Sequence, residues 1–338
     1  MNKMKIKSII GIDLGTTSTK IYVKDLGFLG ELPTVIAIHK KTQKVIAYGE
    51  EANKMLGRSP AYIEIVRPVL QGIITHFDEA MMFLELIIRD ALKKQYSLLR
   101  PKIIISIPLD LTDVQKRGVI EVAKNSGASE VYLIECPLAS ALGTNLNIDI
   151  AKGTFVVDIG GGTTDIAIIS YGGIVLGKSI KIGGDSFNRS ICNYVKENFN
   201  LIIGEKQAEL AKIEIGTIHP RPEKSYLLKG RDVNSGLPRE FLFTSQNLRE
   251  SLEEDISRIT LAIKDIINAT PPDLLNDIST DGCFLTGGGA LIEGLNSYLE
   301  KEIKMPVIIS DNPKYAAIRG LGKIIEELDY YKRLLINV

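Results

Sequence analysis

Two stretches of the chain share one pattern of apolar and polar residues. In each, a run of apolar residues ends in an aspartate, and a turn rich in glycine and threonine leads into a second β-rich run. The first stretch covers 9–23 and contains Asp13, and the second covers 155–169 and contains Asp158. Each pattern predicts a β-hairpin with a glycine-rich tip. Two such hairpins indicate two related half-domains that face each other.

Apolar residues at helical spacing occupy much of the chain between and after the hairpins. In the first such segment, Asp78 and Glu79 lie near the start and Lys93 and Lys94 at the end, as the helix dipole favours. The predicted helices cover 77–94, 112–126, 186–198, 205–215, 246–269 and 294–303. Strands that alternate with helices in this way predict an α/β fold with mixed sheets.

Length and charge narrow the classes of function. The chain has 338 residues, 45% of them hydrophobic, which favours more than one domain. Lys+Arg and Asp+Glu both number 41, so no overall basic field attracts nucleic acid, and we expect no nucleic-acid partner. The three cysteines and three histidines are scattered, which argues against a disulfide framework and a Cys/His metal site.

The N-terminal segment resembles neither a membrane span nor a signal peptide. No apolar stretch approaches the roughly 20 residues that cross a bilayer. The first apolar run is short and is soon followed by Asp13, which is incompatible with the core of a signal peptide. We therefore expect a cytoplasmic protein.

The two hairpin tips have the chemistry of a phosphate clamp. Glycines allow the backbone to approach a phosphate, and successive N–H groups with threonine hydroxyls form an anion-binding nest. An aspartate at the strand end supplies a carboxylate for Mg²⁺, usually through water. Ordinary hairpin turns are the alternative for either tip alone. The shared position of Asp13 and Asp158, with a third glycine turn at 287–289, favours the phosphate clamp. A dinucleotide fold is disfavoured, because neither turn has GxGxxG opening a helix.

These motifs resemble those of a known superfamily. Residues 13–17 and 158–164 are similar to the two phosphate loops of the actin superfamily, and 286–289 resembles its adenosine motif. Within that superfamily, the chain resembles the MreB family of bacterial actins over nearly its whole length. The matching phrases are 32–38, 49–58 with the following Arg67-Pro68, and 203–216.

The resemblance implies an α/β actin-like ATPase fold with two lobes, each a mixed-sheet core with a smaller subdomain. The first core would comprise 1–31, 68–140 and 314–338, with 32–67 as its small subdomain. The second would comprise 141–184 and 250–313, with 185–249 as its small subdomain.

The resemblance also assigns roles to residues around ATP and Mg²⁺. Asp13 and Asp158 correspond to the magnesium-shell carboxylates. The first phosphate clamp would be Gly15, Thr16 and Thr17, the second Gly160, Gly161 and Gly162, and the nucleoside contacts Glu209, Lys212, Gly287, Gly288 and Gly289. A surface ion pair is the alternative for Glu209 and Lys212, which are one helical turn apart. Lys20 either reaches a phosphate, as the lysine of actin does at this offset, or lies at a strand edge in water.

The catalytic motif departs from the family pattern. The MreB family orients the attacking water with a glutamate immediately before a proline and a threonine of the second phosphate loop. Thr163 is retained here, but Cys136 stands before Pro137. A thiol bonds water weakly and is mostly uncharged at neutral pH. Glu135 is a doubtful substitute, because neighbouring side chains point in different directions. We predict that ATP binds and is hydrolysed slowly. The alternative is that Glu135 or another carboxylate takes over.

The resemblance further implies self-assembly into filaments at the inner face of the cell membrane, where membrane-bound adaptor proteins are possible partners. Tyr96, Leu98 and Leu99 lie between basic residues, where the family has an apolar loop that enters the membrane. Packing of the leucines on the core is the alternative. Two other functions stay open, namely a filament that positions plasmids or organelles and a soluble metabolic kinase of the same superfold.

Overall fold

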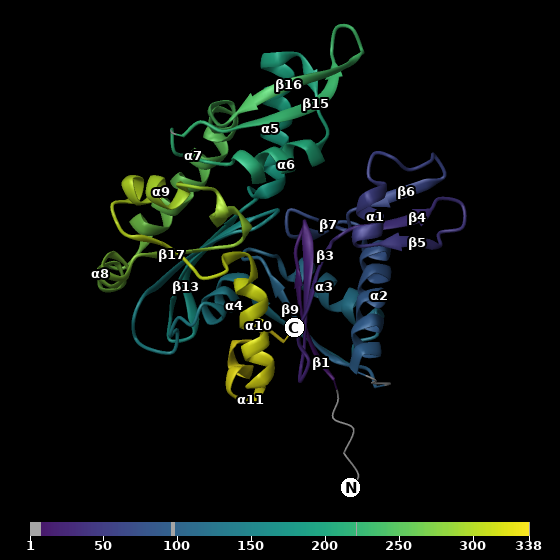
Figure 1. Cartoon of the computed structure of the whole chain (residues 1–338). Coiled ribbons are helices and arrows are strands. Elements are labelled where there is room, and N and C mark those ends of the chain that lie inside the picture. Colours follow the sequence, from purple (N-terminus) through teal and green to yellow (C-terminus); the bar gives the residue numbers. More distant parts are fainter. Residues whose placement is uncertain (1–7, 96–98, 221, 338) are drawn as a thin grey trace.

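Two five-stranded sheets with the same strand topology form the centre of the protein (Figure 1). The computed structural model describes residues 8–95, 99–220 and 222–337. The first sheet has the order β10-β9-β1-β2-β3 and the second β13-β12-β11-β17-β18. Their bounds are β1 Ile9–Leu14, β2 Ser18–Val23, β3 Gly27–Pro33, β9 Lys102–Ile107, β10 Glu130–Glu135, β11 Thr154–Ile159, β12 Thr164–Ser170, β13 Gly173–Ile180, β17 Cys283–Thr286 and β18 Val307–Ile309.

The duplication predicted from the two hairpins is confirmed. β1 pairs antiparallel with β2 and parallel with β9, and β11 pairs in the same way with β12 and β17. Strand β1 therefore corresponds to β11. Asp13 lies near the end of the first of these strands, and Asp158 lies near the end of the second. Parallel strands need helical crossovers, which accounts for the alternation of strands and helices in the sequence.

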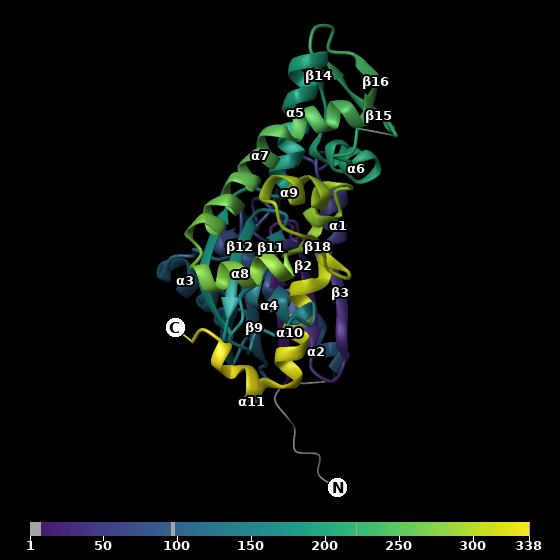
Figure 2. The same ribbon diagram turned by 90° about the vertical axis from the view of Figure 1, so that its left-hand side faces the viewer.

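Helices cover both faces of each sheet. Their bounds are α1 Glu50–Met55, α2 Phe77–Gln95, α3 Asp113–Asn125, α4 Cys136–Gly143, α5 Gly184–Phe199, α6 Glu205–Ile215, α7 Ser245–Ala269, α8 Pro272–Asp281, α9 Leu295–Ile303, α10 Ala316–Glu326 and α11 Leu328–Tyr331, with short 3₁₀ turns at Gly288–Leu291, Pro313–Tyr315 and Lys332–Leu334. Helices α2 and α3 pack on the outer face of the first sheet, and α7 and α9 on that of the second. Helices α4 and α10 lie between the two sheets (Figures 1 and 2).

Alternation along the central strands divides the core into three layers. On β9, Ile103 and Ile105 pack toward α2 and α3, whereas Ile104 packs toward α4 and α10. On β11, Val157 packs toward the second outer layer and Val156 toward α4 and α10. Because side chains alternate across a strand, each sheet is buried on both faces.

The two inner helices approach each other at glycines. A Cβ atom on Gly143 of α4 would lie 1.9 Å from the carbonyl oxygen of Ala316, and one on Gly320 of α10 would lie 1.8 Å from that of Ala139. No side chain fits in either place, so the two backbones are in direct contact. This contact joins the lobes behind the hairpin tips.

Two small sheets extend beyond the central ones, in the upper part of Figure 1. One has the order β5-β4-β6 and carries α1, and the other has the order β14-β15-β16 and packs against α5 and α6. Their bounds are β4 Ile36–His39, β5 Val45–Tyr48, β6 Ile63–Val66, β14 Leu201–Ile202, β15 Ser225–Asp232 and β16 Pro238–Thr244, and a further ribbon pairs β7 Val69–Leu70 with β8 Ile73–Ile74. The domain boundaries given above stay a prediction.

The six predicted helices are confirmed within two residues at each end. Thr112 caps α3 with a capping box, in which its side chain accepts from the backbone N–H of Gln115. Helices α4 and α10 were not predicted from the sequence. Over the described part of the chain, none of the helices has the length and apolar character that crossing a bilayer requires.

Candidate nucleotide site

The two glycine-rich tips touch each other across the junction of the lobes. A Cβ atom on Gly161 would lie 2.2 Å from Oγ1 of Thr17, and one on Gly162 would lie 2.2 Å from Oγ1 of Thr16. Thr16 also accepts a hydrogen bond of 2.9 Å from the backbone N–H of Gly72. Only glycine allows this approach, so the structure brings the two predicted phosphate loops into one place.

Asp13 is held by a lysine and a serine. Lys20 lies directly opposite on β2 and its Nζ is 2.8 Å from Oδ2, while Ser106 donates to Oδ1 at 2.7 Å. Lys20 is only 8% exposed, so the alternative of a strand-edge lysine in water is wrong. Burial alone would lower the pKa of Lys20, but the charge of Asp13 raises it above its ordinary value.

Asp158 is buried and receives two hydroxyl hydrogen bonds. Ser140 of α4 and Thr286 at the end of β17 both donate to Oδ2 at 2.7 Å. Burial raises the pKa of Asp158, these hydrogen bonds oppose the change, and the charge of Asp13 raises the pKa further. The two carboxylates therefore act on each other across the lobes. Ser140 and Thr286 were not singled out from the sequence.

The donor set around these carboxylates fits a hydrated Mg²⁺. Among the described residues, no group of three His, Cys, Asp or Glu side chains is arranged to hold a metal ion directly. Mg²⁺ keeps several waters and takes few carboxylates where phosphates supply the other ligands. Asp13 and Asp158 match that requirement, because each already has protein partners and would bind the ion through water.

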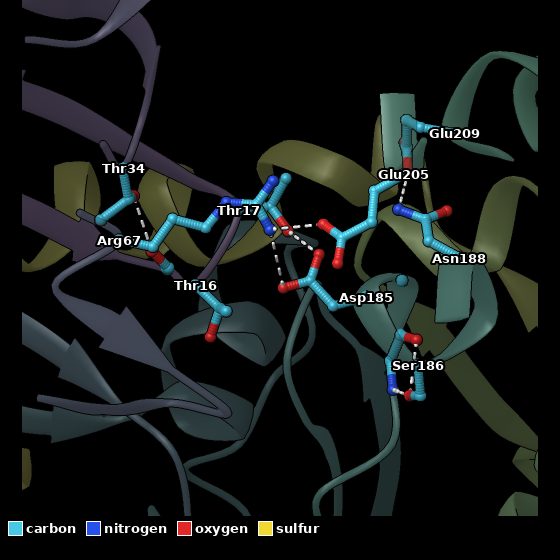
Figure 3. A network of polar contacts seen from close by, with 12 residues as sticks. Thr16, Thr17, Thr34, Arg67, Asp185, Ser186, Asn188, Glu205 and Glu209 are labelled. Atoms are coloured by element: carbon cyan, nitrogen blue, oxygen red, sulfur yellow. Dashed lines mark hydrogen bonds and ion pairs between the residues drawn. The ribbon is translucent and has the colours of Figure 1, made fainter. Parts of the chain in front are cut away.

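Glu209 and Lys212 form an ion pair that belongs to a larger, partly buried network of hydrogen bonds. Lys212 Nζ donates to Glu209 Oε2 at 2.6 Å, to Asn188 Oδ1 at 2.9 Å and to the carbonyl of Gly184 at 3.0 Å. Asn188 in turn donates to Glu209 at 2.7 Å, as Figure 3 shows. The side chain of Glu209 keeps 37% exposure, which leaves an oxygen available to a ribose hydroxyl. Asn188 is a member of this network that the sequence motif did not indicate.

The third glycine turn packs against the second phosphate loop. A Cβ atom on Gly287 would lie 2.3 Å from the carbonyl oxygen of Ile159, and one on Gly289 would lie 2.2 Å from Cγ2 of the same residue. Gly287 also has a φ of 81°, which favours glycine. A Cβ atom on Gly288 would meet nothing within 4 Å, so its backbone borders open space.

The sulfur of Cys136 lies 3.9 Å from the hydroxyl oxygen of Ser140, which donates a hydrogen bond to Asp158. Burial, followed by the charges of Asp158 and Asp13, raises the pKa of Cys136 well above its ordinary value, so the thiol keeps its proton. Burial also raises the pKa of Glu135, but the charges that act on it are those of Lys116 and Asp110. The two neighbours are therefore directed toward different surroundings, as expected for adjacent residues at the end of a strand.

Asp165 is a further buried carboxylate at the second hairpin. Oδ2 accepts from the Thr163 hydroxyl at 3.0 Å and Oδ1 from the N–H of Leu109 at 2.8 Å. Burial, with repulsion from Asp158 as a smaller contribution, raises the pKa of Asp165 to about 7. The sequence reasoning passed over this residue.

An ionic contact joins the lobes beside the first phosphate loop (Figure 3). Nη1 of Arg67 is 3.1 Å from Glu205 Oε2 and 4.0 Å from Asp185 Oδ2. The hydroxyl of Thr17 donates to Asp185 Oδ1 at 3.2 Å. Glu205 and Asp185 lie in the first turns of α6 and α5, so this contact ties the second lobe to the first loop.

Of the three residues predicted to enter a membrane, Tyr96 and Leu98 lie outside the described residues. Leu99 is 38% exposed.

Comparisons with known proteins agree with this architecture. The family model described as MreB/Mbl protein matches residues 7–333. The cell shape-determining protein Mbl of Bacillus cereus is 41% identical over 95% of this chain and 96% of its own length. The cell shape-determining protein MreB of Escherichia coli is 39% identical over 95% and 94%.

Solved structures show the same fold. MreB5 of Spiroplasma citri bound to ADP superimposes with a TM-score of 0.91 and 33% identity, over 97% of this chain and 99% of that one. A MamK double helical filament superimposes with a TM-score of 0.81 and 19% identity, over 95% and 99%, which concerns the fold alone. The fold is that of the two-lobed, actin-like proteins. The chain belongs to the MreB/Mbl family.

The buried carboxylate of Asp165 generates a stability prediction. Its pKa in the folded state, about 7, exceeds its ordinary 3.8, so folding loses stability as pH rises between these values. The asparagine of Asp165→Asn does not titrate. We therefore expect the free energy of unfolding of this variant, relative to that of wild type, to increase by up to ~3 kcal/mol between pH 5 and pH 8. Urea unfolding of the nucleotide-free proteins at both values measures this gain. A stability difference that is independent of pH would contradict the prediction.

Proposed function

We propose that this chain is an ATP-binding bacterial actin homologue that polymerises into cytoskeletal filaments supporting cell shape. One observation carries the nucleotide part of the proposal. The tips at Thr16 and Thr17 and at Gly161 and Gly162 come from separate lobes and contact each other, with Asp13 and Asp158 behind them. Such an arrangement suits one polyphosphate held from both sides.

Each residue type has a distinct part in binding. The N–H groups around Gly15 and Gly160 to Gly162 donate to phosphate oxygens, and the threonine hydroxyls add donors. Lys20 supplies positive charge beside the phosphates, since its ammonium already lies against Asp13. Glu209, with Lys212 behind it, binds the ribose, and the backbone at Gly288 lies against the nucleoside. Mg²⁺, when bound, neutralises phosphate charge.

Support for the filament comes from the relatives. Those that match over 95% of this chain are named for cell-shape determination. MreB5 of Spiroplasma citri was solved with ADP and with AMPPNP. A nucleotide held by both lobes favours their closed arrangement, in which ATP acts as a conformational clamp for a polymer-competent subunit.

The direct test is assembly with nucleotide. We expect calorimetry to detect binding of Mg-ATP, and negative-stain microscopy and sedimentation to detect filaments with ATP. Gly161→Val, whose side chain has no space against Thr17, should abolish both. The matched control is Gly173→Val. Gly173 lies at an exposed strand start, so this variant should still bind ATP and form filaments. Wild-type protein that takes up no ATP at millimolar concentration, or that stays monomeric with it, would refute the proposal.

We further propose that hydrolysis is slow because Cys136 occupies the position of the water-orienting glutamate. A protonated thiol neither holds nor polarises water as a carboxylate does. Groups of this kind contribute about 100-fold or more to rate, so Cys136→Glu should accelerate phosphate release by roughly that factor, whereas Cys136→Ser should not. Single-turnover phosphate release measures it, and a wild-type rate equal to that of Cys136→Glu would sink the idea.

Association with the membrane surface is a third part of the proposal. Leucines flanked by lysines and an arginine suit the boundary between acyl chains and anionic head groups. We expect the double change Leu98→Ser and Leu99→Ser to reduce co-sedimentation with anionic liposomes severalfold, while thermal unfolding stays close to wild type. Unchanged liposome binding would remove this segment from the proposal.

A further inference from the structure

Three side chains of α5 and α6 form a closed set of hydrogen bonds. Asn188 of α5 donates from Nδ2 to Oε2 of Glu209 in α6 at 2.7 Å (Figure 3). Lys212, one turn further along α6, donates to the same Oε2 at 2.6 Å and to Oδ1 of Asn188 at 2.9 Å. Each of the three therefore contacts the other two, and together they occupy only one of the two carboxylate oxygens of Glu209.

The ammonium group of Lys212 determines how the Asn188 amide is turned. A lysine only donates, so the amide must direct its oxygen to Nζ, and its NH₂ group then points to Glu209. Asn188 is only 6% exposed, and a buried amide is costly unless such partners satisfy it. A leucine has a similar shape and needs no partner. Packing alone therefore does not account for an asparagine in this place.

Lys212 donates all three of its protons within the protein. The third goes to the carbonyl oxygen of Gly184 at 3.0 Å. An ammonium group has three donors and no acceptor, so none is left for a ligand in this arrangement. The side chain is also only 11% exposed. Lys212 therefore acts on a bound nucleotide through the orientation of Glu209.

The same network is attached to the second phosphate loop. The N–H of Gly184 donates to the carbonyl oxygen of Gly160 at 3.0 Å. The residue that accepts from Lys212 is thus fixed directly to that loop. Glu209 is in turn held in a fixed position relative to the loop, as a group must be that contacts the sugar of a nucleotide whose phosphates lie there.

We propose that Asn188 is a positioning residue for the sugar, and that it makes this site selective for ribonucleotides over deoxyribonucleotides. The inference rests on the proposed function and specifies the class of nucleotide. Because Asn188 and Lys212 occupy Oε2 of Glu209, the carboxylate keeps one orientation and presents Oε1. An ionised carboxylate only accepts, so Oε1 requires a hydroxyl that donates. A sugar with hydrogen in place of that hydroxyl leaves the oxygen without this partner.

The first measurement needs no variant. Calorimetry on wild-type protein compares Mg-ATP with its 2′-deoxy and 3′-deoxy analogues. A hydrogen bond to a charged group is lost when the contacting hydroxyl is missing, so at least one analogue should bind about 10- to 100-fold more weakly than ATP. Two analogues that both bind as tightly as ATP would overturn the inference.

The second measurement uses Asn188→Leu, which removes the amide with little change of shape. Glu209 is then held by Lys212 alone, so we expect ATP to bind roughly 5- to 10-fold more weakly. The weaker-binding deoxy analogue does not use that carboxylate, so its dissociation constant should stay within about twofold of the wild-type value. The preference for ribose therefore falls. A general disturbance of the site would instead weaken ATP and the analogue alike.

Two further variants make this comparison specific. Asn193→Leu is the matched control, because Asn193 is an exposed asparagine of the same helix, and it should keep both wild-type dissociation constants. In Glu209→Gln the amide oxygen would accept from Asn188 and Lys212, so an NH₂ group would replace Oε1. This variant should also lose the preference for ribose, and the double variant Asn188→Leu/Glu209→Gln should lose no more. Because Glu209 is partly exposed, this substitution also provides the test if Asn188→Leu does not fold.

The outcomes distinguish this inference from the function on which it rests. Absence of ATP binding by wild type contradicts the proposed function itself. Normal ATP binding without a preference for ribose overturns the inference alone. So does a preference that Asn188→Leu leaves unchanged, or a loss of affinity in that variant that is equal for ATP and for the deoxy analogue.

Discussion

The rest of the structure depends on one electrostatic constraint, the placement of two aspartates from different lobes close enough to act on each other. Asp13 and Asp158 end equivalent strands of the two sheets, and the charge of one raises the pKa of the other. Such repulsion costs free energy. Lys20 offsets it on one side and hydroxyl donors offset it on the other. In the proposed function, a polyphosphate with its bound Mg²⁺ would complete this balance, because the ion would supply further positive charge beside the two carboxylates.

Helix α4 connects these carboxylates to the backbone contact that joins the two lobes. Its first residue, Cys136, contacts the hydroxyl of Ser140 one turn later, and Ser140 donates to Asp158. Its last residue, Gly143, is in backbone contact with α10. Packed interiors transmit small shifts because they contain no free volume to absorb them. Helix α4 therefore links the carboxylate of Asp158 to the contact between the lobes.

Local sequence patterns predicted the helices and strands that are determined by residues close to one another in the chain. The hairpins and the helices with periodic apolar faces were predicted correctly, because each depends on neighbours in the chain. The short helix after Cys136 was not, since it is apolar on all sides and owes its place to burial between two sheets. Asn188 and Arg67 acquire partners only through tertiary packing, and no spacing rule indicates them. The sequence left two alternatives for Lys20 for the same reason, because its burial depends on tertiary packing.

The substitution at Cys136 is understandable from the charges around it. Three carboxylates already act on that position, and burial adds to their effect on any acid placed there. A glutamate would bring a fourth negative charge, which needs a bound cation to be tolerated. A thiol removes that repulsion, and its sulfur lies 3.9 Å from the hydroxyl oxygen of Ser140. The groups that suit a triphosphate are therefore retained in this site, whereas a thiol replaces the family's water-orienting glutamate, and this difference is the basis of the proposed slow hydrolysis.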